Sequence, residues 1–579
     1  MANLKTRFRP ILDFRRFKAN EQMPKVRNGT HKLVALPVRF LHICHLPFFL
    51  YAVARSRRIL SFCRLPFAFC LLLFLSSSAA AHVGSPDVFF EGNAGPYPVF
   101  VTVRLPLVIP GVAEIEIRTQ SRDVQEMRIV PLRLTGAGSE YPPTPDVAAR
   151  SKQDPQFFTG SLWLMEGGAL QVRIMVKGAR GPGEVAVPVP SVAQRVLPMQ
   201  KPLGAILLVM LALLAAGAVS IAGAGAREAR LEPGVAPTVS SRRRARVVMA
   251  IAAALVLGVI FLGGSWWNTE AARYANNVYK PPLVHATLEP GGRLLLRGEP
   301  GHLGTRFGLP SETRLDDLIP DHNHLMHLFL VRVPGMDAFW HLHPDQIEPG
   351  VFLERLPPMP AGRYRIFADI VHRSGFPETQ VGEVTLPSIA GTAMTGDDCA
   401  WTGAPLPAAA ADLSIDGSAN RSTNGSIIGS TISNLPDGDR MVWERPAGAL
   451  KAKSPLSFQF VVEDAVGKPV EDMEPYMGMP GHAEFIGADL SVFAHVHPSG
   501  SVSMAALEIA QSGLSGPSGG EGGDLSMAAM PGMSANPTSH PEATVSFPYG
   551  FPQAGLYRIF VQVKHGGRIE TGVFDARVE

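Results

Sequence analysis

Short apolar runs alternate with glycine- and proline-rich turns over most of the chain, a pattern typical of antiparallel β structure. Strand-like runs at 99–104, 113–118 and 169–176 predict a β-sandwich over 82–200. The whole chain is predicted to be mainly β, with several immunoglobulin-like antiparallel β-sandwich domains.

Two longer uncharged runs, 203–225 and 247–267, interrupt this pattern. Each is long enough to cross a bilayer, so they predict two transmembrane helices. The intervening segment 226–246 holds six Arg and two Glu, which the positive-inside rule assigns to the cytoplasm. Residues 82–200 and 268–579 would then both lie on the exported side.

The N-terminal region also predicts export. Residues 1–58 form a basic preamble with 13 Lys/Arg and two acids, and we expect it to be unstructured. An apolar stretch ending in three alanines makes 59–81 a predicted signal peptide or anchor. Cleavage after Ala81 would make His82 the first residue, so that its α-amine and imidazole could together bind one metal ion.

A histidine motif occurs twice, about 155 residues apart. A lone histidine, a Val/Phe/Leu-rich run around a turn, and His-x-His-Pro follow one another from His327 to Pro344 and again from His482 to Pro498. Residues i and i+2 of a strand share a face, and a hairpin turn would bring the lone histidine opposite that pair. The motif therefore predicts clusters formed by His327, His341 and His343, and by His482, His495 and His497.

A second shared motif extends the repeat. Ala-Gly-x-Tyr-Arg-Ile-Phe occurs at 361–367 and 554–560, and each copy places a histidine eight residues after the tyrosine, His372 and His565. We predict two His-rich β-sandwich modules, 283–390 and 440–579, joined by a linker at 391–439. A low-complexity loop insertion at 511–541 would interrupt the second module. His372 and His565 complete two predicted four-histidine sets.

Such recurring sets predict a metal site, with hydrogen-bonded core imidazoles as the alternative interpretation. Imidazole suits zinc, copper, iron or nickel. The thioethers of Met326, Met477 and Met479 lie beside the histidines and favour copper, with zinc as the alternative. His322 and His324 could extend the first site, but they precede the strand and are expected to be solvated loop residues.

Composition excludes several other classes. The 53 Lys/Arg and 50 Asp/Glu form no basic stripe suited to nucleic acid. Only four cysteines are present, three of them before residue 71, which excludes a disulfide scaffold and leaves Cys399 as an expected unpaired structural residue. The sequence lacks a phosphate loop, a serine-nucleophile elbow and a His-Glu-x-x-His motif, so we do not expect an enzyme.

The Ala81-His-Val-Gly-Ser-Pro-Asp87 start, the membrane anchors and the Tyr-Arg-Ile-Phe modules resemble bacterial secreted proteins with YtkA-like domains. More loosely, they are similar to copper-resistance proteins of the CopC type. The resemblance implies immunoglobulin-like sandwiches and, for His82 only, Cu(II) binding at a mature N-terminus. The two transmembrane segments and two further modules depart from the CopC pattern.

The sequence thus predicts an exported protein of the bacterial inner membrane, with most of the chain periplasmic or extracellular, that binds or relays copper. Its expected partners are the metal ion, the membrane and an envelope protein. A metal-free interaction scaffold and a copper-dependent oxidoreductase are the two alternatives.

Overall fold

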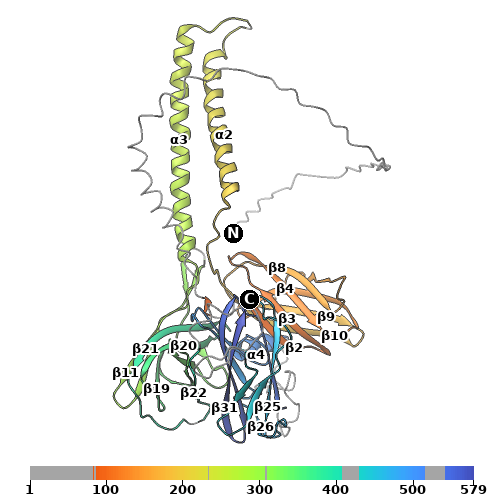
Figure 1. The fold of residues 1–579 in the computed structure, drawn as a ribbon. Helices are drawn as coiled ribbons and strands as arrows, with labels where there is room; N and C mark the ends of the chain where they lie inside the picture. Colours follow the sequence, from red (N-terminus) through yellow and green to blue (C-terminus); the bar gives the residue numbers. More distant parts are fainter. Residues whose placement is uncertain are drawn as a thin grey trace, which may run out of the picture. The chain divides into compact units, whose positions relative to one another are not determined.

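The fold is mainly β, as predicted. The structure, a computed structural model, describes residues 82–83, 87–232, 234–306, 309–394, 396–406, 429–514 and 542–579. Within these ranges the chain forms three β-sandwiches and two long helices (Figure 1). The predicted basic preamble 1–58 and signal segment 59–81 lie outside the described residues.

The N-terminal β-sandwich is built from two antiparallel sheets. One sheet has the order β2 (Asp87–Ala94), β3 (Tyr97–Arg104), β4 (Gly111–Thr119), β8 (Phe157–Leu164) and β7 (Ala149–Arg150). The other has the order β10 (Gly181–Ser191), β9 (Gly168–Gly178), β5 (Val124–Arg133) and β6 (Asp146–Val147). Alternate residues such as Val101, Ile115 and Ile174 point inward, are fully buried and form the shared core.

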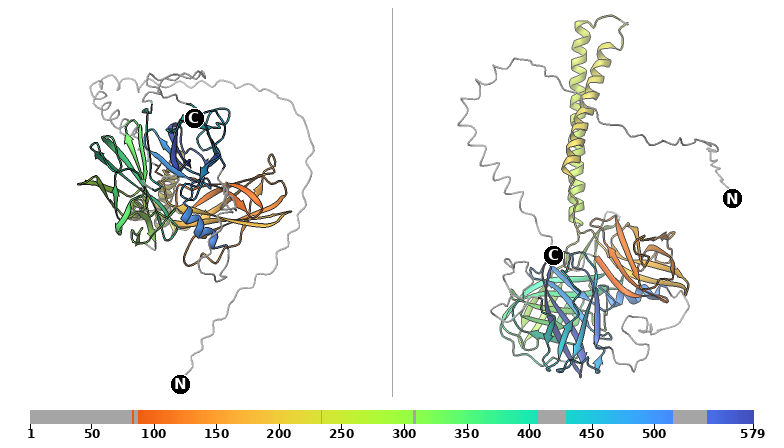
Figure 2. Two further views of the ribbon diagram at one scale, coloured as in Figure 1. Left: turned by 90° about the horizontal axis from the view of Figure 1, so that it is seen from below. Right: turned by 45° about the vertical axis from the view of Figure 1, so that its right-hand side comes forward.

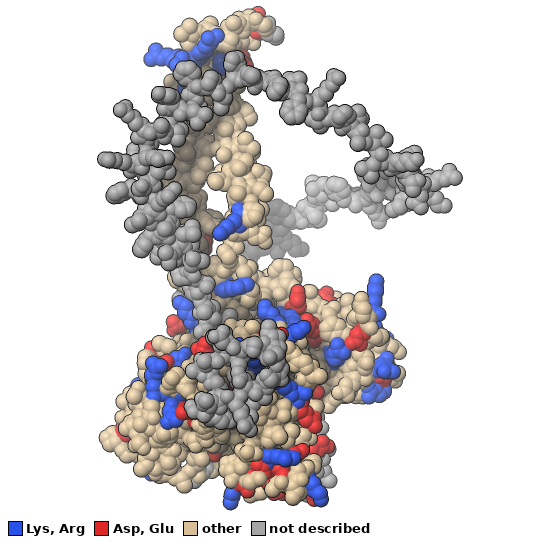
Figure 3. Space-filling model, in the orientation of Figure 1, with Lys and Arg blue, Asp and Glu red and all other residues tan. Residues whose placement is uncertain are grey.

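Two helices follow, α2 (Lys201–Glu228) and α3 (Val239–Asn276), and both exceed the predicted runs. The connection is therefore 229–238, shorter than the predicted 226–246, because Thr238 caps α3 by accepting a hydrogen bond from the Ser241 N–H. Both helices are long and apolar enough to cross a membrane, and their apolar windows are entirely unburied. Basic side chains gather at their connected ends (Figure 3).

The first His-rich module is the second β-sandwich. Its outer sheet has the order β11 (Val284–Glu289), β12 (Arg293–Gly298), β19 (Val351–Arg355) and β18 (Asp345–Glu348). Its inner sheet has the order β15 (Leu318–Ile319), β20 (Gly362–His372), β16 (His327–Val333), β17 (Ala338–Leu342) and β22 (Cys399–Thr402), with β21 (Pro377–Leu386) also on β20. Strands β13 (His302–Arg306) and β14 (Leu309–Glu312) form a separate two-stranded hairpin. Strand β22 corrects the predicted linker 391–439, because it pairs with the edge of β17.

The second module repeats this design. Its outer sheet has the order β23 (Ile432–Asn434), β24 (Arg440–Trp443), β25 (Leu456–Glu463) and β29 (Thr544–Tyr549). Its inner sheet has the order β1 (His82–Val83), β28 (Val492–Val496), β27 (His482–Gly487), β30 (Gly555–His565) and β26 (Met473–Glu474), with β31 (Arg568–Val578) on β30. Strand β23 also falls in the predicted linker. Helix α4 (Met504–Ser512) includes the first two residues of the predicted 511–541 insertion; residues 515–541 are not described.

The two inner sheets pack face to face through aromatic rings. Phe339 stacks on Phe560 with ring centroids 4.2 Å apart, and Phe367 stacks on Phe493 at the same distance. Phe339 and Phe493 hold equivalent places in the repeat, as do Phe367 and Phe560, so each pair reproduces the other with the modules exchanged. The two modules lie side by side in every view (Figure 2).

Because of strand alternation, the two faces of each inner sheet pack against different surfaces. In β16, Leu328 and Leu330 belong to the core of the first module, whereas Phe329 and Val331 belong to the apolar cluster between the modules. In β28, Val492 and Ala494 lie in the core of the second module and Phe493 lies between the modules. Both faces of these sheets are therefore buried, which explains their nearly unbroken apolar sequences.

The aromatic stacks predict a measurable stabilisation. Phe560 is fully buried, so Phe560→Ala should lower the free energy of unfolding by about 3–5 kcal/mol, and Phe560→Leu by clearly less. A double-mutant cycle with Phe339→Ala should give a coupling of about 1 kcal/mol. Urea unfolding of the detergent-solubilised protein measures both quantities. Val466→Ala, at an 80% exposed position, is the control. If Phe560→Ala and Val466→Ala lowered the free energy of unfolding equally, the interface would be contradicted.

Candidate metal centre

Imidazole rings from both modules gather where the two inner sheets meet. Eight rings of the described chain belong to this cluster: His322, His324, His327, His341, His343, His482, His495 and His497. Contacts cross the interface, with ring centroids 5.5 Å apart for His327 and His495 and 5.1 Å apart for His322 and His482. The cluster thus joins what the sequence presents as two separate sets.

The β-hairpins place these rings as the motif predicts. Strands β16 and β17 pair with Phe329 opposite His341 and Leu328 opposite Leu342, so His327 lies diagonal to His341. The rings share a face with Phe329 and Phe339, which is the face that meets the other module. In the second module His495 lies opposite Glu484, on the same face as Ile486 and Phe493.

His372 and His565 do not join the cluster, so the predicted four-histidine sets are wrong. Strand alternation puts them on the core-facing side of β20 and β30, with Ile370 and Val563, and not on the side that meets the other module. His372 instead contacts Asp317 at 3.0 Å, and His565 contacts Asp437 at 3.2 Å.

The two histidines contact different sets of carboxylates. Asp437, Asp439 and His565 lie close enough to form a third candidate metal group. His372 is held between Asp317 and Glu378, with its Nε2 3.6 Å from the Glu378 carboxylate. Each histidine therefore ends its strand among carboxylates.

Of the three methionines predicted as ligands, two pack in hydrophobic cores and one lies beside the cluster. Met326 is 1% exposed and packs in the core of the first module, because it alternates with His327. It is a core residue, and the prediction that it is a ligand is wrong. Met479 is 3% exposed and packs with the core of the N-terminal sandwich. Met477 is buried beside the cluster, and its carbonyl oxygen lies 2.9 Å from Nδ1 of His322.

Two equivalent turns lead into the lone histidines. His322 and Asn323 have φ of 50° and 69°, and Met477 and Gly478 have φ of 49° and 79°. Both are tight turns closed by paired backbone hydrogen bonds, between Asp321 and His324 in one module and between Tyr476 and Met479 in the other. Aligning the turns makes His322 equivalent to Met477 and His324 equivalent to Met479.

His322 and His324 are therefore not the solvated loop residues that the sequence predicts. The tight turn folds both rings back into the cluster, where His324 stacks on His343 with centroids 4.0 Å apart. The carboxylate of Asp321 accepts a hydrogen bond from the Ala505 N–H in the first turn of α4, which fixes the turn against the second module.

His82 lies at a neighbouring edge. Strand β1 pairs in parallel with β28, with His82 next to Val492, three residues before His495. At about 3.3 Å per residue, its backbone lies about 10 Å along the strand from that of His495. Its predicted role as an N-terminal Cu(II) ligand stays a prediction.

The hydrogen bonds of His327, His341 and His343, the first three-His group, leave a lone pair on each ring. A carbonyl or carboxylate oxygen can only accept, so His327 donates from Nε2 to the Asp321 carbonyl and His343 donates from Nδ1 to Asp398. His341 likewise donates from Nδ1 to the Oε1 of Gln562, 3.0 Å away, with that amide oriented as in this structure.

These assignments make Nδ1 of His327 and Nε2 of His341 two lone pairs facing each other at 3.0 Å. Two bare lone pairs repel at that distance, whereas two nitrogens bound to one ion at about 2.0–2.1 Å lie about this far apart. Nε2 of His343 also has no hydrogen-bond partner among the described residues. The donor set therefore fits a metal ion.

The second three-His group consists of His322, His482 and His497. His322 donates from Nδ1 to the Met477 carbonyl and His497 donates from Nδ1 to the Val502 carbonyl, each over 2.9 Å. Their Nε2 atoms, and both ring nitrogens of His482, have no hydrogen-bond partner within the described chain. Outer hydrogen bonds that fix the tautomer, with the inner nitrogen left free, are the usual arrangement of metal-binding histidines.

His495 lies between the two groups. Its ring contacts those of His327 and His482 at 5.5 and 5.4 Å, and its Nε2 lacks a hydrogen-bond partner in the described residues. Its Nδ1 is 3.3 Å from Asp369 of the first module. Asp369 and Gln562 are equivalent in the repeat, so each module orients a histidine of the other.

Burial keeps these rings neutral, the state in which imidazole binds metal. Loss of solvation is the largest cause, and it lowers the pKa of both His322 and His327 to about 3. Burial and then neighbouring imidazoles lower the pKa well below its ordinary value for His341, His343, His482 and His495.

Sequence reasoning missed Glu484. Its side chain is fully buried, neither carboxylate oxygen has a hydrogen-bond partner in the described part of the chain, and burial raises its pKa well above the ordinary value. Its position two residues after His482 on the same strand face was the available signal. Tyr476 was missed as well; its hydroxyl donates to the Asp397 carbonyl and lies 3.8 Å from the sulfur of Cys399, which is a buried free thiol as predicted.

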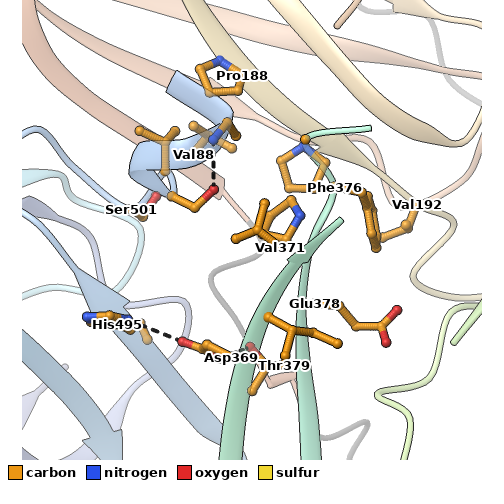
Figure 4. A pocket seen from close by; sticks show the side chains of 18 of the residues that line it. Val88, Pro188, Val192, Asp369, Val371, Phe376, Glu378, Thr379, His495 and Ser501 are labelled. Carbon is orange, nitrogen blue, oxygen red and sulfur yellow. Dashed lines mark hydrogen bonds and ion pairs between the residues drawn. The ribbon is translucent and has the colours of Figure 1, made fainter. Parts of the chain in front are cut away.

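Two hollows border the cluster. A cavity of about 500 Å³ lies between the three β-sandwiches, with largely apolar walls that include Val88, Phe376 and Val371 and with His495 at one side (Figure 4). A second pocket, of about 480 Å³, belongs to the first module and is lined by His324, His343 and four acidic side chains.

A family described as a domain of unknown function, DUF8832, matches residues 436–579, which is the second module. No curated protein matches the chain.

Similar solved structures include Escherichia coli alpha-2-macroglobulin activated by porcine elastase, with 9% identity over 85% of this chain and a TM-score of 0.15. The ICAM-5 D1–D4 ectodomain fragment is also similar, with 9% identity over 82% of this chain and 74% of its own, and a TM-score of 0.12. The chain spans only 31% of the length of the macroglobulin.

Glu354 in the acidic pocket gives a pH prediction for the metal-free protein. Burial, and then the nearby Asp398 carboxylate, raise its pKa from 4.5 to about 7. The native state therefore binds this proton more tightly than the unfolded state, and stability is lost as pH rises from about 4.5 through about 7. Glu354→Gln should remove this loss and be more stable than wild type at pH 8, by roughly 2 kcal/mol.

Urea unfolding at pH 4.5 and pH 8 in the presence of chelator measures the difference. The matched control is Glu348→Gln, an exposed position on the same hairpin, which should follow the wild-type pH dependence. Parallel pH profiles for Glu354→Gln and wild type would contradict the assignment.

Proposed function

We propose that this is a membrane-anchored, exported protein that binds copper ions at the imidazole cluster between its two His-rich modules. One observation supports this above all others. Six buried ring nitrogens of five clustered histidines have no hydrogen-bond partner in the described residues: His322 Nε2, His343 Nε2, His482 Nδ1 and Nε2, His495 Nε2 and His497 Nε2.

Hydrogen bonding within the protein does not account for this arrangement. A buried polar atom without a partner costs about 1–3 kcal/mol, so six of them would offset most of the stability of an ordinary domain. A neutral imidazole has one donor and one acceptor, and here the donors are largely used by outer oxygens while the acceptors converge. A bound cation would satisfy these acceptors together.

The choice of copper rests on the donor set. Imidazole nitrogen binds Cu(II) more tightly than other divalent first-row metals, and a thioether favours Cu(I). Met477 occupies in one turn the place that His322 occupies in the other, so the repeat offers sulfur where its twin offers nitrogen. When bound, copper would supply a cation that changes between two oxidation states. Zinc is the alternative that three neutral imidazoles also fit.

The surrounding residues hold the ligands in their metal-binding form. Asp398 and Gln562 fix the protons of His343 and His341 on the outer nitrogens, and the carbonyls of Met477 and Val502 do the same in the second group. The stacked phenylalanines close one side of the cluster to water. These residues position the imidazoles without taking part in a reaction.

The cellular setting is part of the same proposal. Helices α2 and α3 would anchor the chain in a bacterial inner membrane, with the arginine-rich connection in the cytoplasm and the β-sandwiches outside it. The proposal also includes an immunoglobulin-like topology and kinship with YtkA-like and CopC-type proteins. It further includes copper binding by His82 and an envelope partner that exchanges copper. A non-catalytic role is the simplest form of it.

A copper-dependent oxidoreductase is the second candidate, favoured by the cavity of about 500 Å³ that reaches His327, His495 and His497. A space of this size beside a metal could hold an organic substrate. Turnover of oxidisable substrates by the copper-loaded protein would support this candidate, and copper binding without turnover would support the non-catalytic one.

Copper stoichiometry tests the proposal directly. The full-length protein, loaded with copper and desalted, should retain two ions per chain by elemental analysis. His341→Ala with His343→Ala should leave one ion, and so should His482→Ala with His497→Ala, because losing two of three imidazoles removes a site. The four substitutions together should leave none.

His285→Ala is the matched control, since His285 is exposed and contacts only Glu299 among described ion-pair partners. It should retain two ions. A wild-type protein that retains no copper would favour the metal-free scaffold, and a quadruple variant that retains as much as wild type would place the copper elsewhere.

Cysteine labelling tests the orientation in the membrane. A membrane-impermeant maleimide applied outside intact spheroplasts should label Val466→Cys, which is 80% exposed on the second module, and should not label Ala236→Cys in the 229–238 connection. The native protein is the background control for labelling of its own four cysteines, of which Cys399 is buried. The reverse labelling pattern would contradict the proposed orientation.

A further inference from the structure

The acidic pocket of the first module bears on how a cation would reach the cluster. It is lined by four carboxylates, from Asp345, Glu354, Asp397 and Asp398, together with His324 and His343. Arg293 and Arg355 are at the exposed rim. The pocket thus belongs to a single module and shares two imidazoles with the cluster.

The side chains of this pocket become steadily less exposed toward the cluster. Asp345 is exposed, the Asp397 side chain is 39% exposed, that of Asp398 is 20% exposed and that of His343 is 3% exposed. Two of these aspartates pair with a histidine: Asp397 lies 3.4 Å from Nε2 of His324 and Asp398 lies 3.1 Å from Nδ1 of His343. The carboxylates therefore lead from solvent to the buried imidazoles.

The inner end of this path points to a ligand independently of the carboxylates. Nε2 of His343 is buried and lacks a hydrogen-bond partner in the described chain. The ring of His343 lies 4.6 Å from that of His341 and 5.0 Å from that of His327, which complete the first three-His group. His324 stacks on the solvent side of the same group, at 28% exposure.

We propose that this pocket is the vestibule through which a hydrated divalent metal cation reaches the first three-His group. The inference rests on the proposed function and adds the route and the form in which the metal arrives. Carboxylate oxygens bind a hydrated cation without stripping its water and raise its local concentration. The cation then passes His324 and exchanges oxygen ligands for the imidazoles of His343 and its neighbours.

The other hollow is a poorer route for a hydrated ion. The cavity of about 500 Å³ also touches the cluster and has four acidic residues in its lining, but most of its wall is apolar, with residues such as Val88, Leu105 and Phe376. Desolvating a divalent ion against such walls is unfavourable. The two hollows would therefore differ in what they admit.

The test is the rate of copper binding, followed by stopped-flow quenching of tryptophan fluorescence in the metal-free, full-length protein. At pH 8, where Glu354 is ionised, Asp345→Asn with Glu354→Gln removes two vestibule charges, and neither side chain forms an ion pair with His324 or His343. At low salt this variant should bind Cu²⁺ on the order of tenfold more slowly, and the difference should disappear near 0.5 M salt because the ions screen the vestibule. Asp345→Lys should slow binding further.

Glu348→Gln with Glu444→Gln is the control that removes two exposed charges outside the pocket. It should bind at the wild-type rate, and all variants should reach the same two ions at equilibrium. If the vestibule variant binds two ions as fast as this control at low salt, the vestibule is wrong and the proposed function stands. If the wild-type protein binds no copper, both the vestibule and the proposed function are wrong.

Discussion

The contact between the outward faces of the two inner sheets determines where the imidazoles lie and how deeply they are buried. In an ordinary β-sandwich the face opposite the core meets water, and histidines on it would be solvated. Here Phe339 and Phe367 of one module stack on Phe560 and Phe493 of the other. The face opposite the core is therefore buried in both modules. The imidazoles at the end of the same strands are carried into a dry interface, where their unused lone pairs matter.

That burial makes the cluster costly for the protein by itself. With each outer nitrogen donating to an oxygen, the inner nitrogens of His322, His343 and His497 are acceptors without donors, and His327 and His341 point lone pairs at each other. Aromatic packing provides the stability that holds such groups together. The arrangement is therefore pre-organised for a cation, because most of the ordering needed for binding has been completed by folding.

The sequence predicted much of this, and its main failures concern which strand face meets the other module. The repeat, the two hairpins and the pairs His341/His343 and His495/His497 followed from period-two alternation. The same alternation places Met326 on the face opposite His327. For His372 on β20, only knowledge of which sheet face meets the other module shows that it lies away from the cluster. Spacing along one chain segment does not reveal such contacts.

The tight turn at His322 was missed for a different reason, since it needs two consecutive non-glycine residues with positive φ, a conformation that few non-glycine residues adopt. The most direct test of the account is anomalous X-ray scattering at the copper edge from crystals of the copper-loaded protein. We expect two peaks, one among His327, His341 and His343 and one among His322, His482 and His497. Copper found only at other groups, with these imidazoles hydrogen-bonded to one another, would contradict it.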